Sequence, residues 1–213
     1  MKAKESAAFG QALGELQSSG LLLASDVTLP SVAGLVAEAP LRGSWWAHPQ
    51  AHAIYRVAKQ LAAHPDVLTA KLISGKVTFV HRRLWTSLFA VATSGEPWQL
   101  RGISPLARKL LSLVTKKGRL RIDRLPAFRG VSAKALGEAA RGLERRLLAF
   151  GESIHTERGS HAKQLESWDH LARRVRLTGR KVAPQMAKKN FEEIAAALKA
   201  RFRTTIHLPW KKI

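Results

Sequence analysis

The strongest constraint on how this chain folds is an ordered run of helix and strand signals in its second half. Two of the expected helices begin at a Ser that can accept a hydrogen bond from a free backbone N–H of the first turn, and Gly-containing turns separate the other segments. In chain order the pattern predicts a helix over 104–117, a short strand over 120–122, a short helix over 123–128, a helix over 132–146, and a hairpin of strands over 147–156 and 161–165.

This order of elements is typical of a winged helix-turn-helix, whose second motif helix enters the DNA major groove. The helix over 132–146 is the candidate for that role. Its outer face carries Lys134, Glu138, Arg141 and Arg145. The basic side chains there could contact guanine edges or phosphates, and Glu138 could accept from cytosine or pair with a basic neighbour. A solvated amphipathic helix would show the same pattern, and the complete motif order favours binding.

The expected hairpin would form the wing of this motif. Arg158 at its Gly-containing tip could enter the minor groove, while Ser160 and Lys163 could contact phosphates. An ordinary hairpin with polar turn residues is an equally good interpretation of this segment.

The first part of the chain predicts helices followed by one hairpin. Local sequence signals indicate helices over 7–16, 28–36, 48–63 and 84–92, the second with Pro30 near its first turn, and two β-rich runs over 67–73 and 77–80 flank a Gly turn. A loop at 94–97 is a candidate boundary. We therefore expect a mainly α (α+β) fold with a helical N-terminal domain over 1–96, a winged helix-turn-helix over 97–172, and a basic C-terminal helix and tail over 173–213.

The charge is distributed very unevenly along the chain. Residues 1–70 contain five basic and five acidic side chains, so the formal net charge of +21 lies entirely in residues 71–213. Such a concentration of positive charge favours a polyanionic partner, because each phosphate met by Lys or Arg releases a condensed counterion. Nucleic acid is the partner we expect, with an anionic membrane surface or an acidic protein as alternatives.

The C-terminal segment adds further candidate phosphate contacts. These are Arg173, Arg174, Lys188 and Lys189, the last two on a helix expected from about residue 185 to 202. Trp210 near the end of the chain could anchor the tail on the core or stack on a base, and anchoring is favoured because exposed Trp is unusual.

The N-terminal part holds a dense set of polar and aromatic side chains. The set comprises Trp45, Trp46, His48, His52, Tyr55, Lys59, Lys71, His81, Arg82 and Arg83. If the protein is an enzyme, His48, His52, His81 and Arg83 are the groups suited to proton transfer or phosphate stabilisation near neutral pH. A packed structural domain with hydrogen-bonded His side chains is the favoured interpretation.

Several other chemistries lack support in the sequence. The spacing of His48 and His52 suits a metal, but the segment lacks the Glu of a HExxH motif, and the chain has no Cys. No nucleotide-binding, dinucleotide-binding or hydrolase motif occurs. We therefore expect no metal and no cofactor.

Residues 118–168 resemble a bacterial winged-helix domain. Across its whole length the chain resembles a bacterial family of winged-helix DNA-binding proteins, on the segments 43–49, 78–85 and 155–163. It is more distantly similar to winged-helix DNA glycosylases of the AlkZ type, which are much longer. Their Gln-containing catalytic motif has no counterpart that we can place here, so this resemblance implies DNA binding rather than glycosylase activity.

These observations together predict a protein that binds double-stranded DNA as a regulator or a DNA-associated accessory factor. The alternatives are a DNA-repair or nucleic-acid-processing enzyme with a glycosylase-like site near 45–52 and 81–83, and an RNA- or ribosome-binding protein. No apolar run is long enough to cross a bilayer and no signal peptide is evident, so a cytoplasmic, nucleoid-associated location without membrane contact is expected.

Overall fold

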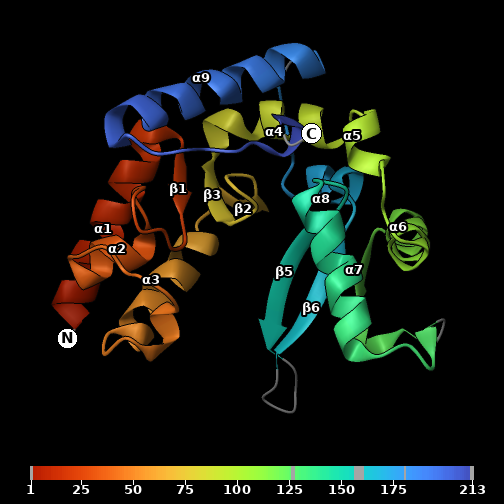
Figure 1. The fold of residues 1–213 in the computed structure, drawn as a ribbon, viewed down its shortest axis with the longest axis horizontal. Coiled ribbons are helices and arrows are strands. Elements are labelled where there is room, and N and C mark those ends of the chain that lie inside the picture. Colours follow the sequence, from red (N-terminus) through yellow and green to blue (C-terminus); the bar gives the residue numbers. More distant parts are fainter. Residues whose placement is uncertain (1, 126–127, 156–160, 180, 212–213) are drawn as a thin grey trace.

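The computed structural model describes residues 2–125, 128–155, 161–179 and 181–211. Over these residues the protein is mainly helical and contains two small three-stranded antiparallel sheets, which confirms the expected mainly α (α+β) class (Figure 1). In the same residues no helix is both long enough and apolar enough to span a lipid bilayer.

The first unit of the fold builds one of the sheets from a hairpin and one strand that lies far from it in the sequence. Its elements are α1 (Lys2–Ser19), β1 (Leu21–Leu23), α2 (Val32–Ala37), α3 (Ala51–Ala62), β2 (Val67–Lys71) and β3 (Val77–His81). The strands lie in the order β1-β3-β2, with Leu22 opposite Phe79 and Thr69 opposite Phe79 on its other side. The hairpin expected around the Gly turn is therefore confirmed, and a third strand joins its edge.

The second unit contains the elements expected for a winged helix-turn-helix. They are α6 (Pro105–Lys117), β4 (Arg119–Arg121), the short 3-10 helix η3 (Ile122–Arg124), α7 (Ala133–Arg145), β5 (Phe150–His155) and β6 (His161–Glu166). The strand order is β4-β6-β5.

The two units share one chain order and one sheet order. Each runs helix, short strand, helical turn or helix, longer helix and hairpin, and in each the first strand pairs with the last. The protein thus contains an internal structural repeat, in which α3 of the first unit corresponds to α7 of the second unit. In the sequence this order is evident only in the second unit, because the three-residue strand β1 carries no alternating polar pattern.

The first sheet is covered on both faces, and this explains why β1 consists of three leucines. In β1 the side chain of Leu22 packs among α1, α2 and α3, whereas Leu21 and Leu23 point into a different core cluster. β3 follows the same alternation, with Phe79 on the first face and Val80 on the second. Successive strand residues point to opposite faces, so a strand between two cores is apolar throughout.

The second face of this sheet packs on a central core that joins the two units. Helix α4 (Trp85–Ala92) and the long C-terminal helix α9 (Pro184–Phe202) cover it, α9 with Ala187, Phe191, Ala195 and Leu198. Phe150 of β5 and Trp168 of α8 (Trp168–Arg174) enter the same core from the second unit. The short helix α5 (Pro97–Leu100) links α4 to α6, and its buried Gln99 donates to the carbonyls of Ala92 and Arg146 at 3.0 and 3.3 Å.

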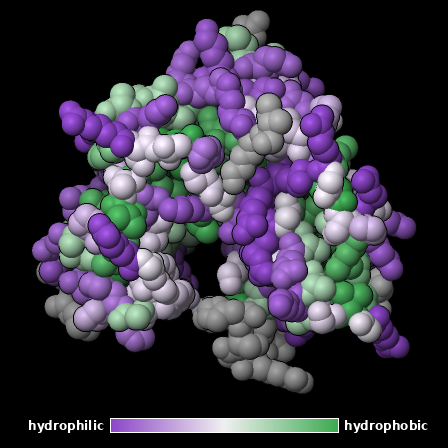
Figure 2. Space-filling model, viewed as in Figure 1, coloured by the Kyte–Doolittle hydropathy of each residue, from purple (hydrophilic) through white to green (hydrophobic). Residues whose placement is uncertain are grey.

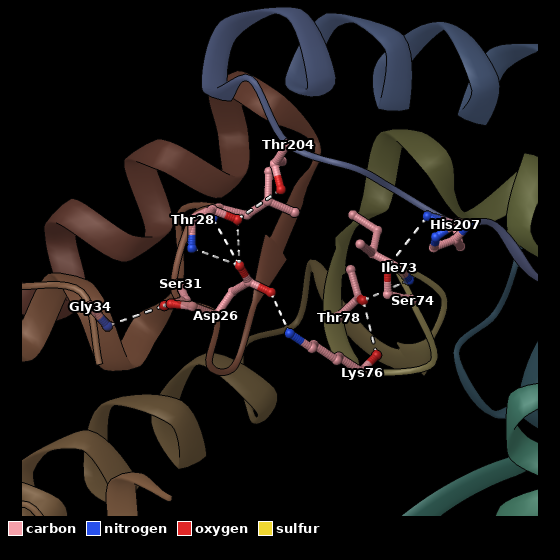
Figure 3. A network of polar contacts seen from close by, with 11 residues as sticks. Asp26, Thr28, Ser31, Gly34, Ile73, Ser74, Lys76, Thr78, Thr204 and His207 are labelled. Carbon is pink, nitrogen blue, oxygen red and sulfur yellow. Dashed lines mark hydrogen bonds and ion pairs between the residues drawn. The ribbon is translucent and has the colours of Figure 1, made fainter. Parts of the chain in front are cut away.

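The segment after α9 crosses the first unit as a strap (Figure 3). The hydroxyls of Thr204 and Thr28 lie 3.0 Å apart, and the Ser74 backbone N–H donates to the His207 carbonyl at 2.7 Å. Near its end Trp210 donates from Nε1 to Glu192 at 2.8 Å and its ring lies beside Phe191 and Trp98. Trp210 therefore anchors the tail, as favoured from the sequence.

Two boundaries expected in the second unit are wrong. The strand expected from residue 147 begins at Phe150, because Leu147 adopts a left-handed conformation (φ 52°) that ends α7. The short helix expected over 123–128 is the 3-10 helix η3, Ile122–Arg124, and residues 126–127 lie outside the described part of the chain.

A buried carboxylate fixes α8 on the second sheet and generates a prediction on stability. Glu166, 1% exposed, accepts from Arg174 at 2.8–3.2 Å and lies 2.6 Å from Nδ1 of His170. Burial raises the pKa of Glu166, but hydrogen bonds from Arg174 and His170 outweigh it and hold the pKa below its usual value.

Replacing Glu166 by Gln should lower the free energy of unfolding by about 2–4 kcal/mol at pH 7, because the partly buried Arg174 loses its anionic partner. Since the folded-state pKa is depressed, the wild-type contribution is complete above about pH 5 and is lost as the pH falls through the folded pKa. Urea unfolding between pH 7 and pH 3 measures both effects. Equal pH dependence in the wild type and Glu166→Gln would contradict this account.

Candidate nucleic-acid interface

Helix α7 is amphipathic, with one face in the core of the second unit and the other in solvent. Its cap Ser132 accepts from the backbone N–H of Ala135 at 3.2 Å, as expected from the sequence. The buried face consists of Leu136, Ala139, Ala140 and Leu143. The side chains predicted to contact DNA, namely Lys134, Arg141 and Arg145, are exposed together with Glu138.

The basic side chains of α7 are not neutralised within the protein. In the described part of the chain, no hydrogen bond or ion pair occupies the ammonium of Lys134 or the guanidinium groups of Arg141 and Arg145. An unpaired surface cation remains available to a phosphate without the cost of breaking an internal ion pair.

The C-terminal end of α7 meets the β2–β3 hairpin of the first unit. A Cβ on Gly75, in the turn of that hairpin, would lie 3.8 Å from the Arg145 side chain. Here five charged residues gather from three elements that are distant in sequence, and we call them the junction cluster. Its members are Lys71 from β2, Arg141, Glu144 and Arg145 from α7, and Lys163 from β6.

Glu144 is the one carboxylate among these five residues and it is buried. It accepts from Nζ of Lys163 at 2.9 and 3.0 Å, and it lies so close to Gly151 of β5 that a side chain there would collide with it. The predicted phosphate contact Lys163 is therefore held by Glu144. With this pair neutralised, Lys71, Arg141 and Arg145 leave a net positive charge at the junction of the two units.

Lys71 is partly buried, as is Lys163 of the same junction cluster. Burial lowers the pKa of Lys71 below its usual value, the field of Glu144 opposes this, and the nearby Lys163, Arg145 and Arg141 lower the pKa further. In the sequence Lys71 belongs to the N-terminal polar set, and nothing in its neighbourhood predicts that it lies near α7. The pairing of units that brings them together leaves no local signal in the sequence.

Figure 2 shows a hollow between the lower parts of the two units, and hydrophilic side chains gather on its wall over the β5–β6 hairpin. The predicted wing residues Arg158 and Ser160 lie outside the described residues, so their contacts with DNA stay a prediction.

The C-terminal cations differ from those of α7 in their partners. Arg174 is bound to Glu166, Lys188 donates to Glu96 at 2.7 and 2.9 Å, and Lys189 lies 4.0 Å from Glu193. Arg173 is exposed, and no such bond occupies it among the residues that the structure describes. A phosphate would have to compete with carboxylates at Arg174 and Lys188.

The four residues considered for an enzyme site fall into two separate pairs. His48 follows the 3-10 helix η1 (Trp45–Ala47), and His52 is exposed on the first turn of α3. His81 pairs with Val67, beyond the other end of α3, and Arg83 follows in the 3-10 helix η2 (Arg82–Leu84). The 12 residues of α3 span about 18 Å, so the two pairs lie at opposite ends of this helix.

Arg83 and His48 each form hydrogen bonds within the protein, and these bonds give both residues a local structural role. Arg83 donates to the carbonyls of Gln17 and Ser18, both at 2.7 Å, and so caps the C-terminus of α1. Nδ1 of His48 accepts from the backbone N–H of Gln50 at 3.2 Å. Burial lowers the pKa of His81, and the field of Arg83 lowers it further. The described residues contain no group of three potential His or carboxylate metal ligands.

Comparison with known proteins gives one distant structural similarity to report. No protein-family model matches the chain, and no curated protein matches it in sequence. The solved structure of the Streptomyces sahachiroi DNA glycosylase AlkZ is similar with a TM-score of 0.43 and 13% sequence identity, over 84% of this chain and 49% of AlkZ. The chain thus spans about half the length of that protein, and the similarity leaves its own activity and substrate open.

Arg83→Ala should lower the free energy of unfolding by about 1–2 kcal/mol, because two charge-assisted hydrogen bonds to the end of α1 are lost at a partly solvated site. His52→Gln, a change at an exposed position of α3, should stay within about 0.5 kcal/mol of the wild type. Chemical denaturation of both variants measures the difference. An unchanged stability of Arg83→Ala would exclude the capping role.

Proposed function

We propose that this protein binds double-stranded DNA with α7 as the helix that contacts the groove, acting as a regulator or a DNA-associated accessory factor. The observation that carries this proposal is the state of the basic side chains on α7. Lys134, Arg141 and Arg145 are exposed and unpaired within the described residues, on a helix whose other face is buried. A helix held rigidly by its apolar face and cationic on its outer face suits the major groove.

The arrangement of charge within the fold supports the same surface. Residues 1–70 are electrically neutral, and the rest of the first unit up to His81 adds only Lys71 and Lys76, so this unit attracts a polyanion less than the second unit does. On α3, the counterpart of α7, Arg56 is paired with Glu5 through two hydrogen bonds. We infer that the first unit positions the second, and that the duplex contacts mainly α7, the wing and the junction cluster.

The enzyme alternative draws no support from the positions of its candidate residues. A shared site would need His48 and His52 close to His81 and Arg83, and α3 separates the two pairs. The RNA alternative is compatible with the same charge, and it becomes an outcome of the binding experiments below.

The first experiment on this proposal measures the salt dependence of binding to a duplex oligonucleotide. Three unpaired cations on α7 predict that the logarithm of the association constant falls with the logarithm of the salt concentration with a slope of about −3 or steeper. Fluorescence anisotropy between 50 and 300 mM KCl gives the slope. Absence of binding at low salt, or a flat dependence, would overturn the electrostatic argument.

A structured RNA of the same length serves as the competitor in that experiment. Tighter binding to the RNA than to the duplex DNA at equal salt would favour the RNA alternative over the proposal.

The second experiment separates the surface of α7 from the rest of the positive charge. Arg141→Ala and Arg145→Ala should each weaken duplex binding by about 1–3 kcal/mol at a preferred site, because each removes a groove or phosphate contact. Lys189→Ala is the matched control, since it removes one exposed charge on the far helix α9. Equal losses in all three variants would mean that α7 has no special part in binding.

A further inference from the structure

A surface pocket of about 490 Å³ opens in the first unit beside the turn of the β2–β3 hairpin. Three segments line it: residues 24–27 after β1, residues of the stretch 41–45 that leads into η1, and Lys76 with Val77 where β3 begins. Its volume falls within the range of about 300–1,000 Å³ that is usual for pockets that hold small ligands. The DNA contacts proposed above use none of the residues that line it.

Exposed apolar side chains are concentrated at this pocket. In the described part of the chain five large apolar side chains are exposed, and two of them, Val27 and Val77, line the pocket. A third, Trp46, is 62% exposed and stacks on the lining residue Trp45, with ring centroids 4.0 Å apart. Single exposed apolar side chains are normal, whereas a group of them around a pocket marks a site for a ligand.

Trp45 gives the pocket a rigid aromatic wall. Its ring packs on the core of the first unit that contains Leu22 and Phe79, and Trp46 covers it at an interplanar angle of 24°. The ring of Tyr55 lies 5.9 Å from that of Trp46 and extends this aromatic group to α3. An aromatic wall that is already held in place suits a planar ring, because little side-chain freedom is lost when the ring stacks on it.

An ion pair supplies a polar part of the lining (Figure 3). The Asp26 side chain, 9% exposed, accepts at Oδ1 from the backbone N–H groups of Thr28 and Leu29, both at 2.9 Å. Its Oδ2 accepts from Nζ of Lys76 at 2.6 Å. A carboxylate oxygen has two lone pairs and an ammonium has three N–H groups. Within the residues that the structure describes, Oδ2 therefore keeps one acceptor site and Lys76 keeps two donors.

This ion pair also limits the kind of ligand that fits. Burial raises the pKa of Asp26, but hydrogen bonds from two backbone N–H groups and from Lys76 outweigh it and hold the pKa below its usual value. Asp26 is thus a carboxylate at neutral pH, and it would repel a phosphate at this place. A neutral ring that carries a donor beside an acceptor fits instead. Every nucleobase has such an edge, and an unpaired base in a pocket is recognised through that edge and by stacking on aromatic side chains.

The turn that precedes β3 connects the pocket with the proposed DNA-binding helix. A Cβ on Gly75 would lie 3.8 Å from the side chain of Arg145 at the end of α7, and the next residue, Lys76, lines the pocket. DNA held on α7 would therefore pass close to the pocket. The neutral charge of residues 1–70 agrees with contact to a base rather than to phosphate.

We propose that this pocket binds one unpaired nucleobase of DNA that is held on α7, with the ring against Trp45 and the polar edge of the base toward Asp26 and Lys76. The inference rests on the proposed function, since the second unit must hold the DNA for a base to reach the first unit. It extends that function from a helix in the groove to the recognition of a base that has left the stack.

The experiment compares two duplexes that differ in one unpaired adenine. Binding of the full chain to an intact duplex, and to the same duplex with one extra adenine in one strand, is measured by fluorescence anisotropy. Stacking of one base on an aromatic side chain predicts about tenfold tighter binding of the duplex with the unpaired adenine. The ratio of the two affinities cancels the electrostatic contribution that both duplexes share.

Trp45→Leu removes the aromatic wall and should bring this ratio close to one, whereas Trp45→Phe keeps a ring and should retain most of it. Lys76→Met removes a donor to the base and should lower the ratio about threefold. Lys59→Met is the matched control, because it removes one exposed lysine of α3 outside the pocket, and it should leave the ratio at the wild-type value.

Photocrosslinking locates the contact on the wild-type protein and decides the question even if Trp45→Leu fails to fold. The photoreactive base 5-iodouracil replaces the unpaired adenine, because on irradiation it loses iodine and forms a covalent bond with an aromatic ring on which it stacks. Mass spectrometry of the digested complex should identify Trp45 as the modified residue.

The outcomes separate this inference from the proposed function. Equal affinity for the two duplexes, a ratio that Trp45→Leu leaves unchanged, or a crosslink outside the lining residues and Trp46 overturns the pocket assignment and leaves DNA binding by α7 intact. Free adenosine in excess should lower the ratio alone. Release of the intact duplex by adenosine would make a free nucleoside the ligand and would also overturn the assignment. Binding to neither duplex overturns both proposals.

Discussion

Burial of the second face of the first sheet is the interaction on which the rest of the structure depends. Leu21, Leu23 and Val80 on that face meet α4 and α9, and Phe150 and Trp168 reach the same core from the second unit. Because interiors are close-packed, this shared core sets the orientation of the two units as well as their stability. This apolar core fixes the position of α7 relative to β2 and so brings the residues of the junction cluster together. The core itself contains none of the residues proposed to bind DNA.

The sequence predicted the second unit well because its signals are local. The caps Ser104 and Ser132 and the spacing of Leu136, Ala140 and Leu143 lie within single helices, so periodicity was enough to define α6 and α7. The same approach missed β1, since three consecutive leucines are apolar on both sides and carry no alternation. Without β1 the repetition of the order in the first unit could not be recognised.

The candidate site was predictable only in part for a related reason. Lys134, Arg141 and Arg145 were found because helical spacing alone places them on the outer face of α7. Which cations are already neutralised depends on contacts between distant residues, such as Glu96 with Lys188, 92 positions apart. The same is true of Lys71 and of the separation between the two His pairs, because both follow from packing between elements rather than from spacing along the chain.

The strap that follows α9 has a consequence for how the protein is made. Thr204 contacts Thr28 across 176 positions of the chain, and His207 contacts Ser74 across 133. During synthesis the apolar second face of the first sheet therefore stays partly uncovered until α9 has been made, although the strands of both units precede α9 in the chain. Contacts between segments so distant in sequence form slowly, and the apolar surface that they will cover is exposed until then. Premature termination before residue 184 would yield a chain in which the first unit has all its strands but only α4, and not α9, over the second face of its sheet, a form suited to chaperone binding and proteolysis.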